Sequence, residues 1–310
     1  MVVLWFLGKV ILASRPRQWL DFTMLYLMMQ VARPLPRQWA LAWGRALGDF
    51  VWKVVGFRRD IVLDNIRHAF GHEMDEAGVR NIARSFYRNL GMTLMEFLKL
   101  PHMKTGEIDD LVEIEGLEYL DELKTGGGAI FVSGHFGNWE YTGARAAALG
   151  IPVSFMVKTQ HNPHVDRIQN DIRARAGVGI IRTGASVKEM IRALRRGEFI
   201  GMLADQDAGK DGVFVDFLGR PASVLKGAGY LSWRLKVPLI TAYTFRQQDG
   251  HHLLVVDPPV YPDRNLGEED AVRRLTEHHV QRLEAAVRRA PDHFYWVHRR
   301  WKTSPPKETQ

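Results

Sequence analysis

A histidine and a glutamate five residues apart, His135 and Glu140, form the pattern in this chain that points most clearly to chemistry. On one continuous helix this spacing would place the two side chains about 140° apart, so they could not pair. A histidine in a turn and a glutamate in the first turn of the next helix can face each other, and Gly134 and Gly137 allow the tight bend that this needs. A carboxylate that accepts one imidazole N–H fixes the tautomer, so the other ring nitrogen can take a proton from a hydroxyl.

The pair resembles a hydrolase triad without its serine, and the chain has no Gly-x-Ser-x-Gly elbow. The hydroxyl of an acceptor molecule would then be the nucleophile and would attack an acyl thioester directly. Backbone N–H groups at the start of the following helix would stabilise the oxyanion that forms. The alternative is that His135 is a structural residue at the end of a strand, with no chemical role.

The elements that must position this pair are short apolar runs that alternate with amphipathic stretches. The predicted strands are Ala129–Ser133, Val153–Val157, Phe199–Ala204, Val213–Phe217, Pro238–Thr244 and Leu253–Val256. The predicted helices between and after them span 138–149, 163–176, 186–196, 224–235 and Glu268–Ala290. This alternation indicates crossover units, and it predicts an α/β fold with a mostly parallel central sheet flanked by helices.

The region before the sheet reads as helical. We expect a membrane-associating helical segment over 1–35, an acyltransferase domain over 36–302 and a flexible tail over 303–310. Within the domain, 36–125 would form a helical layer and 126–302 the α/β core. The stretches Val2–Ala13 and Leu20–Ala32 are apolar but shorter than a spanning helix, which favours interfacial anchors. The alternative is that they pack on the domain as core helices.

Charge and composition narrow the class of partner without choosing one. Lys and Arg number 42 against 35 Asp and Glu, a net charge of +7, which favours an anionic partner such as phospholipid, nucleic acid or an acidic protein. The chain has no cysteine, which excludes disulfides and thiolate chemistry. No nucleotide fingerprint and no helical metal-binding pair is present, so we predict no cofactor and no metal. A non-enzymatic alternative is a basic module that binds membrane or nucleic acid.

The segment Ser-Gly-His135-Phe-Gly-Asn-Trp-Glu140 resembles the lauroyl/myristoyl acyltransferases of lipid A biosynthesis, within the lysophospholipid acyltransferase superfamily. Further blocks resemble that family in the same order along the chain. These blocks are Arg59–Ile66 with Ala69 and Phe70, Phe86–Gly91 with Glu96, Ala204–Gly209 and Tyr295–Lys302.

The resemblance implies acyl transfer at the cytoplasmic face of a bacterial inner membrane, from acyl carrier protein to a glycolipid, without nucleic acid. It implies that His135 and Glu140 are catalytic. It also implies a set of substrate-binding residues, namely Gly137, Asn138, Trp139, Arg173, Asp205 and Gln206. For Asp205 a site-shaping role is favoured over proton transfer. An acyltransferase for phosphatidylinositol mannosides or lysophospholipids would use the same histidine and glutamate, so the lipid acceptor stays open.

Overall fold

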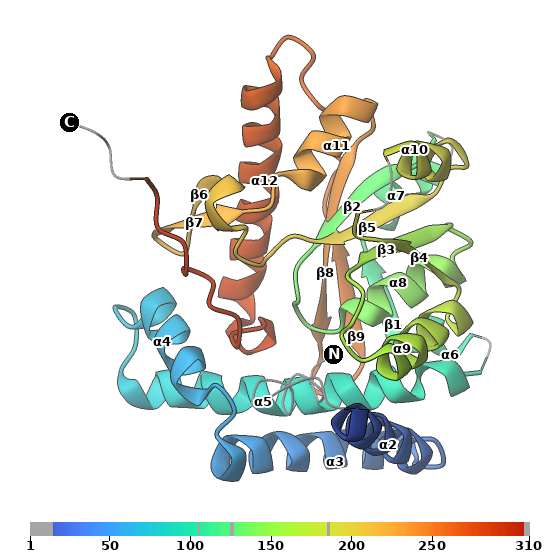
Figure 1. The fold of residues 1–310 in the computed structure, drawn as a ribbon, viewed down its shortest axis with the longest axis vertical. Helices are drawn as coiled ribbons and strands as arrows, with labels where there is room; N and C mark the ends of the chain where they lie inside the picture. The colour runs from blue at the N-terminus through green and yellow to red at the C-terminus, as the bar shows by residue number, and fades with distance from the viewer. Residues whose placement is uncertain (1–14, 105, 125–126, 185–186, 307–310) are drawn as a thin grey trace.

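A computed structural model of the protein describes residues 15–104, 106–124, 127–184 and 187–306, and its centre is a seven-stranded sheet (Figure 1). The strand order is β1-β9-β8-β2-β5-β3-β4, with every neighbouring pair parallel except β8 and β9. The strands are β1 (Val112–Glu115), β2 (Ala129–Ser133), β3 (Val153–Val157), β4 (Val178–Arg182), β5 (Phe199–Leu203), β8 (Leu239–Arg246) and β9 (His252–Val256). The prediction of an α/β fold with a mostly parallel sheet is therefore confirmed.

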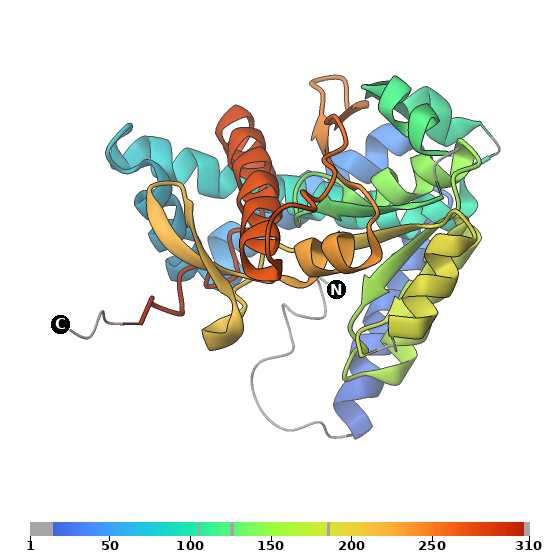
Figure 2. The ribbon, with the colours of Figure 1, turned by 90° about the horizontal axis from the view of Figure 1, so that it is seen from above.

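Helices cover both faces of this sheet, because its central strands are apolar on both sides. Alternate residues of a strand face opposite ways, so Phe131 packs in one core cluster while Ile130 and Val132 pack in another. The helices of this part are α6 (Glu107–Leu111), α7 (Leu117–Lys124), α8 (Trp139–Ala148), α9 (Pro163–Arg175), α10 (Val187–Arg195), α11 (Gly227–Leu235) and α12 (Glu268–Arg289). The view from above shows α12 and α11 on one side of the sheet and α9 and α8 on the other (Figure 2).

A layer of N-terminal helices lies across one end of the sheet, where Figure 1 shows α5 with α3 alongside it. Its members are α2 (Arg15–Ala32), α3 (Arg37–Phe50), α4 (Arg59–Phe70) and α5 (Glu76–Lys99), with a short π-helical turn, Val51–Val55, after α3. The backbones of α3 and α5 meet at Gly44 and Gly91, where an added Cβ would overlap the other helix. Asp49 on α3 binds Arg88 on α5 at 2.8 Å, and the hydrogen bond from Arg88 lowers the pKa of Asp49 to about 2.

The sheet includes segments that the sequence did not identify as parts of it. β1 lies within 36–125, the range predicted to be a helical layer, since a four-residue edge strand carries too little alternation to be recognised. Val213–Phe217 is a strand, β6, but it pairs antiparallel with β7 (Arg220–Val224) in a separate hairpin. The Val178–Arg182 run, not predicted as a strand, is the edge strand β4.

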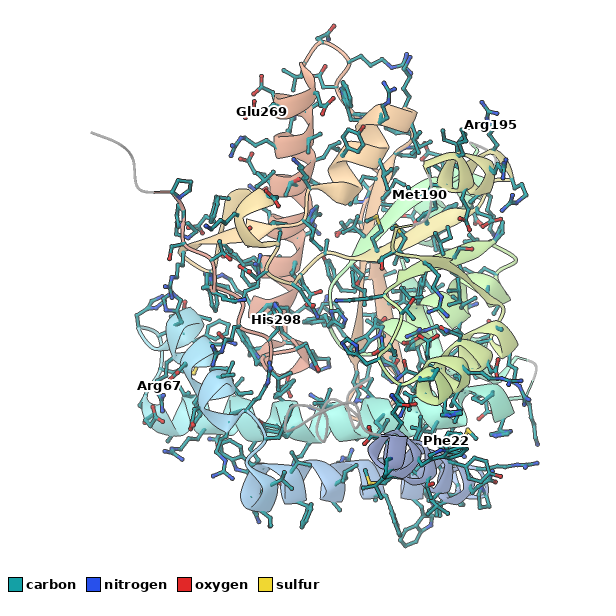
Figure 3. All side chains as sticks on the ribbon, in the orientation of Figure 1. Phe22, Arg67, Met190, Arg195, Glu269 and His298 are labelled. Atoms are coloured by element: carbon teal, nitrogen blue, oxygen red, sulfur yellow. The ribbon has the colours of Figure 1, made fainter. Side chains whose placement is uncertain are left out.

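Of the two predicted anchors, Val2–Ala13 lies outside the described residues, and Leu20–Ala32 belongs to α2. None of the helices between 15 and 306 combines the length and apolarity required to cross a bilayer. α2 packs against α5 and α9, and the Asn162 side chain before α9 donates a hydrogen bond to the Gln18 carbonyl at 2.8 Å. Figure 3 marks Phe22 on this helix at the base of the molecule.

Candidate active site

His135 lies two residues beyond the end of β2, in a turn whose backbone path is set by its glycines and by contacts from distant segments. Gly137 has φ +56°, and an added Cβ would overlap the carbonyl oxygen of Thr244. The Gly137 N–H donates to the His293 carbonyl at 2.9 Å, and the Tyr295 N–H donates to the His135 carbonyl at 3.0 Å. The imidazole is therefore held at the carboxyl end of the parallel strands, where sites of such sheets form.

The carboxylate that contacts this imidazole belongs to Asp205. Its Oδ1 lies 2.8 Å from Nδ1 of His135, and both side chains are buried. Burial favours a neutral carboxyl, but the charge of His135 and its hydrogen bonds hold the pKa of Asp205 below its usual value. An ionised carboxylate only accepts hydrogen bonds, so Nδ1–H is the donor in this contact, and in the neutral form of the ring the free lone pair lies on Nε2.

The structure thus gives Asp205 the contact that the sequence predicted for Glu140. Ser133 on β2 is paired with Leu203 on β5, and both His135 and Asp205 lie two residues beyond that pair. The adjacency of β2 and β5 therefore brings them together across 70 residues of chain. A pattern search within one motif could not find this partner, but the register of these two strands would have indicated it.

Glu140, in the first turn of α8, instead forms a buried ion pair with Arg173 of α9. Arg173 Nη2 lies 2.6 Å from Oε1 and Nε lies 3.0 Å from Oε2, a bidentate arrangement. The indole N–H of Trp139 adds a bond to Oε1 at 3.2 Å. Burial disfavours the Arg173 cation, but Glu140 outweighs it and raises the pKa of Arg173.

His135 and this ion pair line one cavity of about 440 Å³. Among the described residues Nε2 of His135 has no hydrogen-bond partner, and it is not one of the buried unsatisfied atoms, so it is free to meet a substrate group. The apolar walls of the cavity are Phe131, Trp139, Phe155, Met156, Val157, Met202, Leu203, Leu225 and Tyr295. The polar lining includes Gln206 and His298, and burial lowers the pKa of His298 to about 4. Figure 3 marks His298 at the lower end of α12.

The remaining predicted site residues separate into two groups. Trp139 and Gln206 line the cavity with Arg173. Asn138 has no exposed surface, and Gly137 and Asp205 do not line the cavity, so in this structure all three lie behind it. Asn138 caps α8, since its Oδ1 accepts the Tyr141 N–H at 3.2 Å, and its predicted contact with substrate finds no support here.

A buried network that the sequence did not identify supports this turn from behind. Glu96 on α5 accepts a hydrogen bond from Asn138 Nδ2 at 2.9 Å and two from Arg246, at 2.6 and 2.8 Å. His252 Nε2 lies 3.1 Å from the same carboxylate. Although burial opposes the charge, Arg246 and His252 hold the pKa of Glu96 well below its usual value. Glu96 thereby links α5 and β8 to Asn138, the N-cap residue of α8.

The described residues contain no cluster of three or more His, Asp or Glu side chains placed to bind a metal ion. The site therefore consists of an imidazole–carboxylate pair and an ion pair that face one largely apolar cavity. Such a site suits proton transfer on a substrate with a hydrocarbon portion.

Comparison with known proteins finds similarity over nearly the whole chain. A family model for bacterial lipid A biosynthesis acyltransferases matches residues 8–303. The lipid A biosynthesis lauroyltransferase of Escherichia coli K12 is 27% identical over 292 residues, covering 93% of this chain and 92% of that protein. The palmitoleoyltransferase of the same organism is 26% identical over 300 residues, covering 95% and 94%.

More distant similarities concern other lipid acyltransferases. A phosphatidylinositol mannoside acyltransferase of Mycolicibacterium smegmatis is 22% identical over 211 residues, covering 66% of this chain and 67% of that protein. The crystal structure of a 1-acyl-sn-glycerophosphate acyltransferase from Thermotoga maritima aligns with a TM-score of 0.39 and 15% identity, covering 80% and 96%. Because the family model spans almost the full length, the chain belongs to the bacterial lipid A biosynthesis acyltransferase family and is an acyltransferase.

Proposed function

We propose that this protein transfers a fatty acyl group from an acyl carrier protein thioester to a hydroxyl of a lipid A precursor or a related glycolipid. In this proposal His135 is the general base, and the reaction takes place at the cytoplasmic face of the inner membrane. The observation that carries the proposal is the position of the imidazole: its Nδ1 is bound to a buried carboxylate, and His135 lines the cavity together with Arg173.

The proposed reaction needs no covalent enzyme intermediate. Nε2 of His135 takes the proton of the acceptor hydroxyl as its oxygen attacks the thioester carbonyl carbon. The tetrahedral intermediate then collapses, the carbon–sulfur bond breaks, and the imidazolium returns its proton to the thiolate. The products are an ester and a free thiol. Asp205 stabilises the imidazolium that exists between these two steps, because a buried anion 2.8 Å away favours the charged ring.

We assign Glu140 and Arg173 to the electrostatics of the same site. The Arg173 side chain is 11% exposed and lines the cavity, so the cation is available to negative charge that develops on the substrate. Glu140 fixes the plane of the guanidinium through the bidentate contact. In this proposal Glu140 acts on the reaction through Arg173, whereas the sequence had suggested that it acts through His135.

The proposed donor and location are supported by surface properties. The net charge of +7 would favour docking of an acidic carrier protein. Ten of the thirteen exposed large hydrophobic side chains in the described part of the chain lie between residues 19 and 55. They include Trp19, Tyr26, Trp39, Trp43 and Phe50, residue types that suit a membrane interface. This surface lies on the helices that also pack against α5.

Exchange of Trp39 and Trp43 for serine tests the membrane part of the proposal. Each is 57% exposed, and so is Tyr261, which lies far along the chain and provides a matched control. Sedimentation with anionic phospholipid vesicles should decrease for the double tryptophan variant and stay at the wild-type level for Tyr261→Ser. Equal sedimentation of both variants would argue against this surface as the docking face.

Mass spectrometry of reaction products tests the substrate part. Purified protein is incubated with tetradecanoyl-acyl carrier protein and one acceptor in each reaction. The three acceptors are a lipid A precursor, a phosphatidylinositol mannoside and a lysophospholipid. We expect an acyl group to be added to the lipid A precursor and only traces to the other acceptors. Preferential acylation of the mannoside would instead favour the activity for which the Mycolicibacterium smegmatis relative is named.

A further inference from the structure

We infer that Phe155 sets the maximum length of the acyl chain that this protein transfers. The inference rests on the proposed function, because it assumes that the hydrocarbon chain enters the cavity beside His135. Beyond the proposed function, the inference names the residue at which this cavity ends and the direction in which the acyl chain extends. Both follow from the way three adjacent strands place their side chains.

The cavity ends against one row of residues across the sheet. Phe131 on β2 is paired with Gly201 on β5, which is paired in turn with Phe155 on β3. All three therefore face the same side of the sheet, toward α8. The next residues on that side toward the carboxyl ends, Ser133 and Leu203, line the same cavity nearer His135. A chain that enters beside the imidazole and follows the sheet therefore meets the two phenylalanine rings.

A second, small apolar void of about 10 Å³ lies beyond these rings, one row deeper between the sheet and α8. Its lining comes from Leu120, Phe131, Thr142, Gly143, Ala146, Val153, Phe155, Phe199, Leu254 and Val256. Among the described residues only Phe131 and Phe155 line both this void and the cavity of the active site. These two rings are therefore the partition between the two spaces.

Phe155 is the part of this partition that reaches from the sheet to the helix. Its ring occupies space left by two glycines, since a Cβ at Gly143 on α8 or at Gly201 on β5 would lie 2.5 Å from a ring atom. Phe131 is 8% exposed and belongs to the core cluster, whereas Phe155 is half-buried and packs at the edge of that cluster. The aromatic ring thus fills the gap between β5 and α8 as a plug.

Removal of this ring should connect the two spaces. The row of Val153 and Phe199 lies two residues deeper than Phe155 and Gly201, so Phe155→Ala should lengthen the usable cavity enough for about four additional carbons. A longer chain gains burial of its added methylenes, so the ratio of kcat/KM for long against short donors should rise about fifteenfold for every two carbons that enter. Phe155→Trp, with a larger ring, should have the opposite effect.

Competition among acyl carrier protein thioesters of decanoyl to octadecanoyl chains, with products identified by mass spectrometry, tests the inference. The expected result is a shift toward longer chains in Phe155→Ala and toward shorter chains in Phe155→Trp. Phe70→Ala is the control, because Phe70 is a phenylalanine packed in the core that lines neither space. It should lose stability and keep the wild-type chain-length profile.

The outcomes separate the inference from the proposed function. Active Phe155 variants with the wild-type chain-length profile would overturn the inference and leave the proposed function intact. The same shift in Phe70→Ala would also overturn it, since general loosening would then be the cause. Failure of the wild-type protein to transfer any of these chains would overturn the proposed function and this inference with it.

Discussion

Replacement of Asp205 by asparagine removes one charge and almost no volume beside the proposed base. The wild-type Oδ1–Nδ1 distance is 2.8 Å, and the two side chains are only 7% and 1% exposed, so solvent screens the interaction little. An amide oxygen can still accept the Nδ1–H, which keeps the tautomer, but it stabilises an imidazolium far less than a carboxylate does. A buried hydrogen bond to a charged group is worth about 1.5–3 kcal/mol, which corresponds to a loss of about 10- to 150-fold in kcat.

The assay is acyl transfer to the lipid acceptor, with thermal unfolding measured on the same preparations. Asp207→Asn is the matched control, because Asp207 lies two residues away and its carboxylate binds Thr303 and Gly209. It should keep most of the wild-type turnover. A well-folded Asp205→Asn protein that loses no more activity than Asp207→Asn would refute the assignment of Asp205 as the residue that orients and supports His135.

Three further predictions follow from buried charges near the site. Arg173→Lys should lower kcat by about tenfold or more, since one ammonium cannot reproduce the bidentate contact with Glu140, and steady-state kinetics will measure it. Glu96→Gln should lower kcat more than it changes KM, because the loosened Asn138 cap displaces the turn and not the substrate groups. A KM that changes as much as kcat in steady-state kinetics would count against this. Acidification should destabilise the wild-type protein more steeply than the Asp205→Asn variant. The pKa of Asp205 is lower in the folded than in the unfolded protein, so its contribution to stability is complete above the unfolded-state pKa of about 3.9 and is lost as the pH falls through the folded-state pKa. Denaturant titrations of both proteins across this pH range will measure the difference.

The strands that surround the site could be predicted from the sequence because each is a short apolar run with clear boundaries. Ala129–Ser133 and Val153–Val157 were predicted with the boundaries that β2 and β3 have. Edge segments were harder, since β1 has four residues of which two are glutamates, and β4 contains a glycine and ends in an arginine. β6 has the composition of a buried strand, and only its tertiary partner shows that it lies outside the main sheet.

The candidate site could be predicted in its residues but not in its pairings. His135, Glu140, Arg173 and Asp205 were all identified, yet the sequence paired the histidine with the carboxylate nearest in the chain. The observed pairs join β2 to β5 and α8 to α9, so they depend on strand order and helix placement, which no local pattern contains. Glu96 was missed as a support of the site for the same reason, because its partners lie 42 to 156 residues away.

Turnover of His135→Ala tests the central claim most directly. Purified variant and wild-type proteins are compared in acyl transfer from an acyl carrier protein thioester to the lipid acceptor, with unfolding temperature as the control for folding. Loss of the general base should reduce turnover by about 100-fold or more while the protein stays folded. Transfer at the wild-type rate by the folded variant would show that the imidazole between Asp205 and the cavity does not carry the reaction.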